Sequence, residues 1–170
     1  LNSGLISISP IFITLLFYIY FDIIYMVINL ENLTQENIEN VIQKILEDKK
    51  SKFMYTFNSN SENDTLMLGY ILAKYMNSST IITLSGELGS GKTVLVKGIG
   101  KYFNILNDIS SPTFTIVNEY DTPDFPIYHF DVYRLNDMYN FLDTIGTDYF
   151  SKGPCIIEWG EIIEEILPRN

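Results

Sequence analysis

The stretch Gly86-Glu87-Leu88-Gly89-Ser90-Gly91-Lys92-Thr93 decides the fold of this 170-residue chain. It follows an apolar run at 81–84 and precedes a helical pattern, and it matches the P-loop spelling G-x-x-x-x-G-K-[ST] in the strand–loop–helix context that this motif requires. Glycines let successive backbone N–H groups turn towards phosphate oxygens, and the start of the following helix adds its positive end. An ordinary glycine-rich turn would leave the Lys-Thr pair unexplained, so we expect a phosphate-binding loop.

We expect this loop to bind ATP together with Mg²⁺. Lys92 would supply a cation for the β- and γ-phosphates, and the Thr93 hydroxyl would ligate Mg²⁺. The guanine-recognition pattern Asn-Lys-x-Asp does not occur in the sequence, which favours ATP over GTP. The loop residues expected to contact the nucleotide are Gly86, Gly89, Ser90, Gly91, Lys92, Thr93 and Val94.

The composition limits the kinds of partner and site. The formal net charge is −10 and the isoelectric point is about 4.4. This excess of negative charge disfavours direct binding of nucleic acid, which needs clustered Lys and Arg. Any role that involves RNA would therefore work through a partner protein. The single cysteine, Cys155, excludes an internal disulfide, and one His beside one Cys disfavours a zinc site. Cys155 lies in an apolar run, which favours a buried, unreactive thiol.

The beginning of the sequence contains a long apolar stretch. Residues 11–30 are almost continuously apolar, broken by Asp22, and approach the length of a membrane span. The basic flanks of a secretory signal or an anchored helix are missing, because no Lys, Arg or His occurs before Lys44. A membrane anchor, an organelle-type leader and translated upstream sequence foreign to the native protein all remain open. We favour the last, with no membrane contact and a cytoplasmic location.

Two regions follow from this interpretation. Residues 1–53 form a hydrophobic and helical extension that is accessory or non-native, and residues 54–170 form the P-loop ATPase domain. Met26 and Met54 are both candidates for the true start.

The order of predicted elements indicates an α/β protein. The pattern predicts helices at 34–48, 62–76 (capped by Ser61 with Asp64), 91–103 and 160–167, and a helical or turn-rich segment at 136–145. It predicts strands at 53–57, 80–84, 114–120, 126–132 and 154–158. Strands separated by helices favour a mainly parallel sheet between two helical layers, the three-layer sandwich of P-loop NTPases. A hairpin across 121–124 would add antiparallel pairing.

Two carboxylates follow apolar strands and are candidates for the chemistry. Glu158 ends the run 155–157, and Asp131 follows 127–130. Ligands bind at the carboxyl edge of open α/β sheets, where both side chains would emerge. We expect Glu158 to act as a Walker-B-type acid and Asp131 as a second catalytic acid, although each could instead cap a neighbouring helix.

Four further side chains lie near the expected site, and three of them admit two interpretations. Thr113, in the Ser-Ser-Pro-Thr segment 110–113, could contact Mg²⁺ or the γ-phosphate, or belong to a Ser-Pro turn, and spacing does not separate these. Trp159 could be a lid over the site or a core anchor, and by itself it favours the core. His129 is interpreted as a structural strand residue. Arg134 could neutralise transition-state charge, but we favour a surface ion pair.

Several segments together resemble one family. The P-loop is followed by Ser-Pro-Thr-Phe-Thr at 111–115, His-Phe-Asp-Val-Tyr-Arg-Leu at 129–135 and Glu-Trp at 158–159. This series resembles the TsaE family, the P-loop ATPases of bacterial tRNA threonylcarbamoyladenosine (t6A) biosynthesis. The resemblance covers roughly residues 54–168, and the stretch 65–69 resembles the family's first helix.

The resemblance implies an activity, partners and residue roles. The family binds ATP with Mg²⁺, hydrolyses it slowly and resets a complex of TsaB and TsaD, which modifies adenosine 37 of tRNA. Carried over onto this sequence, Lys92 is the phosphate lysine, Thr93 and Glu158 are the Mg²⁺ ligands, and Asp131 and Trp159 are required site residues. Residues near Glu62 and Thr65 would help to hold the base.

The sequence departs from the family pattern in two places. Val94 stands where the family often has a second Thr, which puts the turnover rate in doubt. The family usually continues beyond the position of Asn170, so we expect its last strands to be missing here. There are two alternative functions. One is a nucleotide-dependent binding switch without significant turnover, and the other is a small-molecule P-loop kinase. A kinase is disfavoured because the sequence has no Arg-rich lid segment.

Overall fold

The structure is a computed structural model that describes residues 16–19, 34–47, 59 and 61–168. The predicted strand at 53–57 and most of the apolar stretch 11–30 lie outside these residues. Among the helices of the described ranges, none has the length and apolar character needed to cross a membrane.

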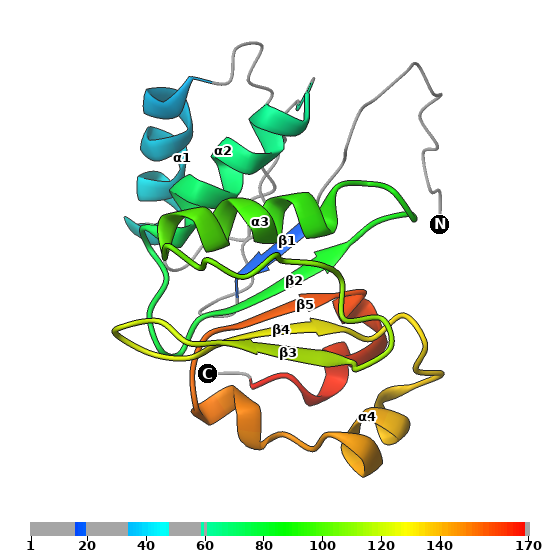
Figure 1. Cartoon of the computed structure of the whole chain (residues 1–170). Coiled ribbons are helices and arrows are strands. Elements are labelled where there is room, and N and C mark those ends of the chain that lie inside the picture. Colours follow the sequence, from blue (N-terminus) through cyan, green and yellow to red (C-terminus); the bar gives the residue numbers. More distant parts are fainter. Residues whose placement is uncertain (1–15, 20–33, 48–58, 60, 169–170) are drawn as a thin grey trace.

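A five-stranded sheet forms the centre of the fold, in the order β1-β2-β5-β4-β3 (Figure 1). Its strands are β1 (Leu16–Ile19), β2 (Ile81–Ser85), β3 (Val117–Tyr120), β4 (Ile127–Asp131) and β5 (Cys155–Glu158). The three central strands β2, β5 and β4 are parallel, whereas β1 and β3 join the two edges antiparallel. The predicted α/β class and the hairpin between β3 and β4 are therefore confirmed, and parallel pairing is found at the centre of the sheet.

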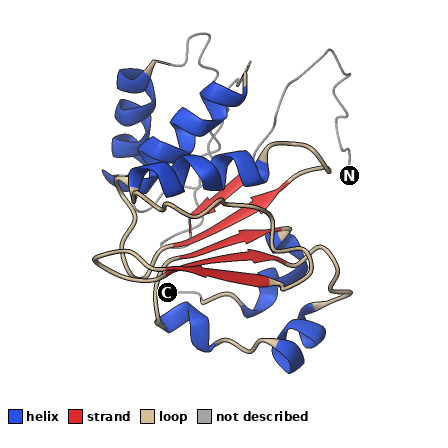
Figure 2. Cartoon of the chain, in the orientation of Figure 1, coloured by secondary structure: helices blue, strands red, loops and turns tan. Residues whose placement is uncertain are grey.

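Helices cover both faces of the sheet (Figure 2). On one side lie α1 (Gln35–Glu47), α2 (Glu62–Ala73) and α3 (Lys92–Tyr102), and on the other lie α4 (Met138–Thr144) and the 3₁₀ segments η1 (Asp148–Ser151) and η2 (Gly160–Ile166). The predicted cap of α2 is confirmed, since Ser61 Oγ accepts from the backbone N–H of Asp64 at 3.2 Å. The helix predicted at 160–167 is a 3₁₀ helix instead. It is interrupted at Ile163, whose φ of −121° and ψ of 16° are not helical.

The alternation of side chains along the strands creates two cores. Ile82, Leu84 and Ile156 belong to the core beneath α1–α3. Phe130 and Cys155 belong to the core beneath α4 and η2. Because both faces are covered, β2, β4 and β5 are buried along their whole length, as is typical of parallel strands. Cys155 is buried as predicted, and burial raises the pKa of its thiol to about 12.

Two glycines allow α2 and α3 to cross in backbone contact. A β-carbon at Gly69 would lie 2.1 Å from the carbonyl oxygen of Leu95, and one at Gly98 would lie 2.2 Å from that of Leu66. No side chain larger than hydrogen fits at either position without separating the helices. α2 is therefore packed directly on the helix that begins at the P-loop.

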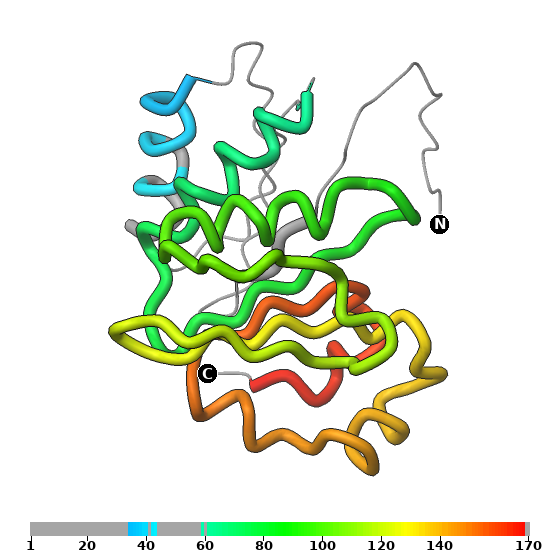
Figure 3. Tube along the Cα trace, in the orientation of Figure 1, coloured from blue at the N-terminus to red at the C-terminus, as the bar shows by residue number. Residues whose placement is uncertain are grey.

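The chain returns to the start of α3 before it enters β3. After α3 ends, the connection runs back alongside the helix towards the carboxyl ends of β4 and β5 (Figure 3). This path brings residues 110–116 to the same end of the sheet as the P-loop. The fold thus gathers segments that are far apart in sequence at one edge.

Candidate active site at the carboxyl edge of the sheet

The P-loop connects β2 to α3 through backbone conformations that suit glycine. Gly89 and Gly91 have φ angles of 80° and 89°, in the left-handed region that other residues rarely adopt. Gly91 also occupies the N-cap position of α3 and provides no side-chain cap. The first N–H groups of α3 therefore lack intrahelical partners and a side-chain cap within the described part of the chain, which is the arrangement that binds phosphate.

Lys92 lies inside this loop rather than in solvent. Its Nζ donates to the carbonyl oxygens of Gly86 at 2.7 Å and Glu87 at 3.0 Å, and its side chain is buried. Burial lowers the pKa of Lys92, while the charges of Glu158, Glu161 and Asp131 oppose that effect. An ammonium that is desolvated and held by neutral carbonyls gains strongly from an anionic partner.

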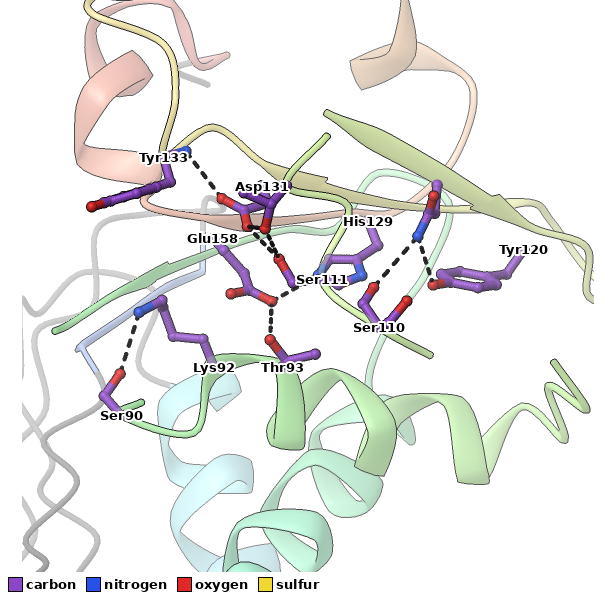
Figure 4. Close-up of polar contacts among 12 residues, drawn as sticks. Ser90, Lys92, Thr93, Ser110, Ser111, Tyr120, His129, Asp131, Tyr133 and Glu158 are labelled. Carbon is purple, nitrogen blue, oxygen red and sulfur yellow. Dashed lines mark hydrogen bonds and ion pairs between the residues drawn. The ribbon is translucent and has the colours of Figure 1, made fainter. Parts of the chain in front are cut away.

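Glu158 lies beside the first turn of α3. Thr93 Oγ1 donates to Glu158 Oε1 at 2.8 Å, and His129 Nε2 lies 2.9 Å from the same oxygen (Figure 4). Glu158 is 3% exposed, and His129 is fully buried. The strand-end acid therefore contacts the hydroxyl expected to bind Mg²⁺ directly, and β4 supplies its second partner.

Asp131 lies opposite Glu158 in the pairing of β4 with β5. Its Oδ2 accepts from the hydroxyls of Ser111 and Thr113, the latter at 2.7 Å, and its Oδ1 accepts from the backbone N–H of Tyr133 at 3.0 Å (Figure 4). Thr113 thus takes part in the site's polar network. Asp131 connects the end of β4 to the segment that precedes β3.

The segment before β3 is a turn where a strand was predicted. The N–H of Ile116 donates to the carbonyl of Pro112 at 2.6 Å, and Ile116 has a φ of 67°. Pairing with β4 begins only at Val117, so the prediction of a strand from residue 114 was wrong at its start. The turn holds Ser111 and Thr113 beside Asp131, a tertiary contact that local strand propensity does not contain.

Trp159 follows Glu158 directly and faces Lys92. Its φ of 64° is in the left-handed region, and its ring centroid lies 4.0 Å from Lys92 Nζ. The ring of Tyr133 packs against the indole at 4.8 Å between centroids. Trp159 also packs against the core beneath α4 and η2, as the core interpretation predicts, whereas its role as a lid over the site stays a prediction. A cation over an indole face is a favourable contact, most so when desolvated.

Other predicted residues have no hydrogen bond to the loop among the described residues. Thr65 is buried in α2, where its hydroxyl lies 2.8 Å from that of Ser59, and Glu62 is exposed in the first turn of α2. Val94 is half-buried in the first turn of α3. Arg134 stacks on Phe114 with its guanidinium 4.2 Å from the ring centroid, and no carboxylate of the described ranges pairs with it. The surface ion pair predicted for Arg134 is therefore not found among the described residues, where its guanidinium stacks on an exposed aromatic ring.

Two residues of the network were missed by the sequence analysis. His129 was interpreted as structural, yet it contacts Glu158, and Ser111 was not singled out although it bonds Asp131. For His129 a signal exists in the period of a strand. It lies two residues before Asp131 and therefore shares a face with it.

A magnesium ion fits the donors at this edge. Thr93 and Glu158 offer a hydroxyl and a carboxylate oxygen, which are hard ligands of the kind Mg²⁺ prefers, and substrate phosphates and water commonly complete its octahedron. Within the described ranges there is no group of three or more His, Cys, Asp and Glu side chains placed to hold a metal.

The family model described as "Threonylcarbamoyl adenosine biosynthesis protein TsaE" matches residues 59–170. The chain belongs to the TsaE family. The resemblance recognised in the sequence is confirmed, and all the TsaE segments that carried it lie within the matched residues.

Curated TsaE relatives support the same assignment. The chain is 39% identical over 109 residues to a protein of Bacillus subtilis (strain 168), covering 63% of this chain and 67% of that one. It is 38% identical over 113 residues to a protein of Treponema pallidum (strain Nichols), covering 65% and 82%. Both relatives are named "tRNA threonylcarbamoyladenosine biosynthesis protein TsaE".

A solved structure shares the fold. The crystal structure of Bacillus subtilis YdiB superimposes with a TM-score of 0.53 at 34% sequence identity, covering 65% of this chain and 67% of that chain. The carboxyl-edge site therefore lies on a fold that has been observed experimentally.

Proposed function

We propose that this chain is the Mg²⁺-dependent ATPase of a tRNA t6A-modification complex, built on the three-layer P-loop NTPase sandwich. The observation that supports this most directly is the 2.8 Å hydrogen bond between Thr93 and Glu158. It joins the P-loop hydroxyl to a strand-end acid, which is the pair that holds Mg²⁺ in P-loop NTPases. The t6A assignment rests on family membership and on the names of the relatives.

The proposed chemistry uses residues of three segments. The N–H groups of the loop and the first turn of α3 would bind the phosphates, and Lys92 would exchange its carbonyl partners for phosphate oxygens. Mg²⁺, held by Thr93 and Glu158, would neutralise charge on the β- and γ-phosphates. Asp131 and the hydroxyls bonded to it would couple this end of the sheet to residues 111–116.

The proposed partners are proteins of the TsaB and TsaD type. In this proposal ATP hydrolysis resets their complex between turnovers, in the cytoplasm and without contact with a membrane. The net charge of −10 supports an indirect relation to tRNA, because direct binding requires basic surface. Glu62 and Thr65 at the start of α2 are proposed to lie near the adenine base.

The test is a reconstitution with purified components. Phosphate release from Mg-ATP is measured for the chain alone and with TsaB and TsaD, alongside t6A formation over several turnovers. We expect slow release alone, faster release with the partners, and repeated t6A formation only when ATP can be hydrolysed. Absence of ATP binding by the chain would overturn the proposal.

A nucleotide-dependent binding switch is the second candidate. The observation that favours it is the bonding of Ser111 and Thr113 to Asp131, because this contact could report nucleotide occupancy to a docking partner. Docking that depends on ATP, with no stimulation of phosphate release, would select the switch over the ATPase.

A further inference from the structure

We infer that His129 is a positioning residue that orients Glu158 for its contact with Mg²⁺. The inference rests on the function proposed above, because it assigns a task to a neighbour of the proposed metal ligand. It concerns a side chain that is fully buried and that would not touch ATP or the metal.

The geometry places both partners of Glu158 on one oxygen. Thr93 Oγ1 lies 2.8 Å and His129 Nε2 lies 2.9 Å from Oε1. A carboxylate that binds a metal only accepts hydrogen bonds, so in this inference His129 donates through Nε2–H. Among the described residues no hydrogen bond reaches Oε2. The two donors therefore fix the rotation of the carboxylate and leave its second oxygen for a ligand.

The two donors come from elements of different kinds. Thr93 lies at the start of α3, next to the loop that must accommodate phosphates, whereas His129 lies in the middle of a buried strand. Tyr120 of β3 stacks against the imidazole with ring centroids 6.4 Å apart. The strand-borne donor is thus packed in place independently of the P-loop.

Packing alone does not explain a histidine at this position. His129 Nδ1 is buried and has no hydrogen-bond partner among the residues that the structure describes. Such a group is costly, and an apolar side chain would avoid the cost on a face shared with Ile127 and Ile156. What the imidazole adds and an apolar residue cannot is the Nε2–H that reaches Glu158.

The experiment compares His129→Leu, His129→Gln and Glu158→Gln with the double variant His129→Leu/Glu158→Gln. Trp159, the single tryptophan, lies over Lys92, so its fluorescence reports ATP binding and its Mg²⁺ dependence without turnover. For His129→Leu we expect the Mg²⁺ concentration at half-saturation to rise about tenfold and kcat to fall about tenfold, as for other residues that orient a metal ligand. ATP binding measured in EDTA should stay within about twofold, because the phosphate loop is untouched.

Two further variants distinguish a positioning role of His129 from a general loss of packing. His129→Gln retains an N–H near the Nε2 position and should recover most of the loss. The double variant should be no worse than Glu158→Gln alone, because His129 acts only through that carboxylate. If His129→Leu does not fold, His129→Asn, whose amide is too short to reach Oε1, takes its place.

Phe130→Leu is the matched control. Phe130 is the next residue of β4, equally buried, and faces the opposite core. It should lower the melting temperature and leave the Mg²⁺ dependence unchanged.

Specific results would overturn the inference. Additive losses in the double variant, or the same Mg²⁺ shift in Phe130→Leu, would show that His129 acts only through packing. An unchanged Mg²⁺ dependence in His129→Leu, while Glu158→Gln loses it, would overturn the inference alone. An unchanged Mg²⁺ dependence in Glu158→Gln would overturn the proposed metal site as well.

Discussion

Glu158 and Asp131 occupy matched positions but are held by different kinds of structure. Each ends a parallel strand, the two are direct partners in the sheet, and they are 3% and 4% exposed. Glu158 is bonded by side chains of a helix and a strand, α3 and β4. Asp131 is bonded by Ser111 and Thr113, which belong to the turn-forming connection before β3.

This difference indicates a division of tasks. Partners on regular elements keep Glu158 in one place, as its proposed role as a metal ligand would require. Asp131, in contrast, holds an irregular segment against the rigid sheet, and such segments open more easily than helices and strands. We therefore expect substitutions at Glu158 to change the chemistry and substitutions at Asp131 to change the connection 110–116.

Removing Lys92 should have the largest effect, because in the proposed function both carboxylates act only when nucleotide is present. Lys92→Ala removes charge-assisted hydrogen bonds to the phosphates, worth about 3 kcal/mol or more, so ATP affinity should fall by at least about 100-fold. Isothermal titration calorimetry measures this loss. Lys101→Ala, at the exposed last turn of α3, is the control and should bind ATP normally. Unchanged ATP affinity in Lys92→Ala would contradict the proposed nucleotide site, and with it the roles expected for Glu158 and Asp131.

Glu158→Gln should have the next largest effect, on turnover rather than on binding. The amide keeps the size of the side chain but loses the charge that holds Mg²⁺, and we expect Mg²⁺-dependent phosphate release to fall about 100-fold or more. ATP affinity should change by less than about threefold. A phosphate-release assay and calorimetry on the same sample separate the two. Glu165 is an exposed carboxylate on η2, so Glu165→Gln is the control. Its phosphate release and ATP affinity should equal those of the unsubstituted protein.

Asp131→Asn should have a smaller effect, confined to the segment it holds. The loss of charge-assisted bonds from two hydroxyls should reduce the local free energy of opening by about 1–3 kcal/mol. Hydrogen–deuterium exchange should become about tenfold faster or more at 111–117, with little change in β5. A uniform increase in exchange across the sheet would instead show that Asp131 stabilises the whole fold.

The rate of thiol labelling at Cys155 should be almost unchanged in Asp131→Asn. Cys155 therefore tests whether the loosening of residues 111–117 extends to β5. It lies three residues before Glu158 on β5, it is buried, and burial raises the pKa of its thiol to about 12. A thiol reagent at pH 8 should therefore react very slowly with the folded protein and with Asp131→Asn, because thiolate is scarce and access is closed. The same reagent should react at once in denaturant. Rapid labelling of folded Asp131→Asn would show that the disturbance reaches β5.

Much of the fold follows from local patterns in the sequence. The apolar runs before Glu158 and Asp131 predict β5 and β4, and the P-loop spelling predicts the junction of β2 with α3. These signals lie within a few residues of one another, so sequence alone suffices. The family resemblance then selected the same acids that the structure brings to one edge.

What the sequence could not supply was contact between distant segments. His129 and Glu158 are 29 residues apart, and no local rule indicates that their side chains meet. The turn at 112–116 was taken for strand because Phe114, Thr115 and Ile116 favour strands. Its left-handed Ile116 is stabilised by tertiary contacts, among them the bond from Asp131 N–H to the Ile116 carbonyl at 2.9 Å.

The glycine crossing of α2 and α3 has a mechanical consequence. Because Gly69 and Gly98 bring the two backbones together, no layer of side chains separates α2 from α3 at the crossing. A displacement of α3 towards α2 would therefore push directly on the backbone of α2. An event at the start of α3 would in this way reach the outer helical layer without a chain of rearranging side chains between them.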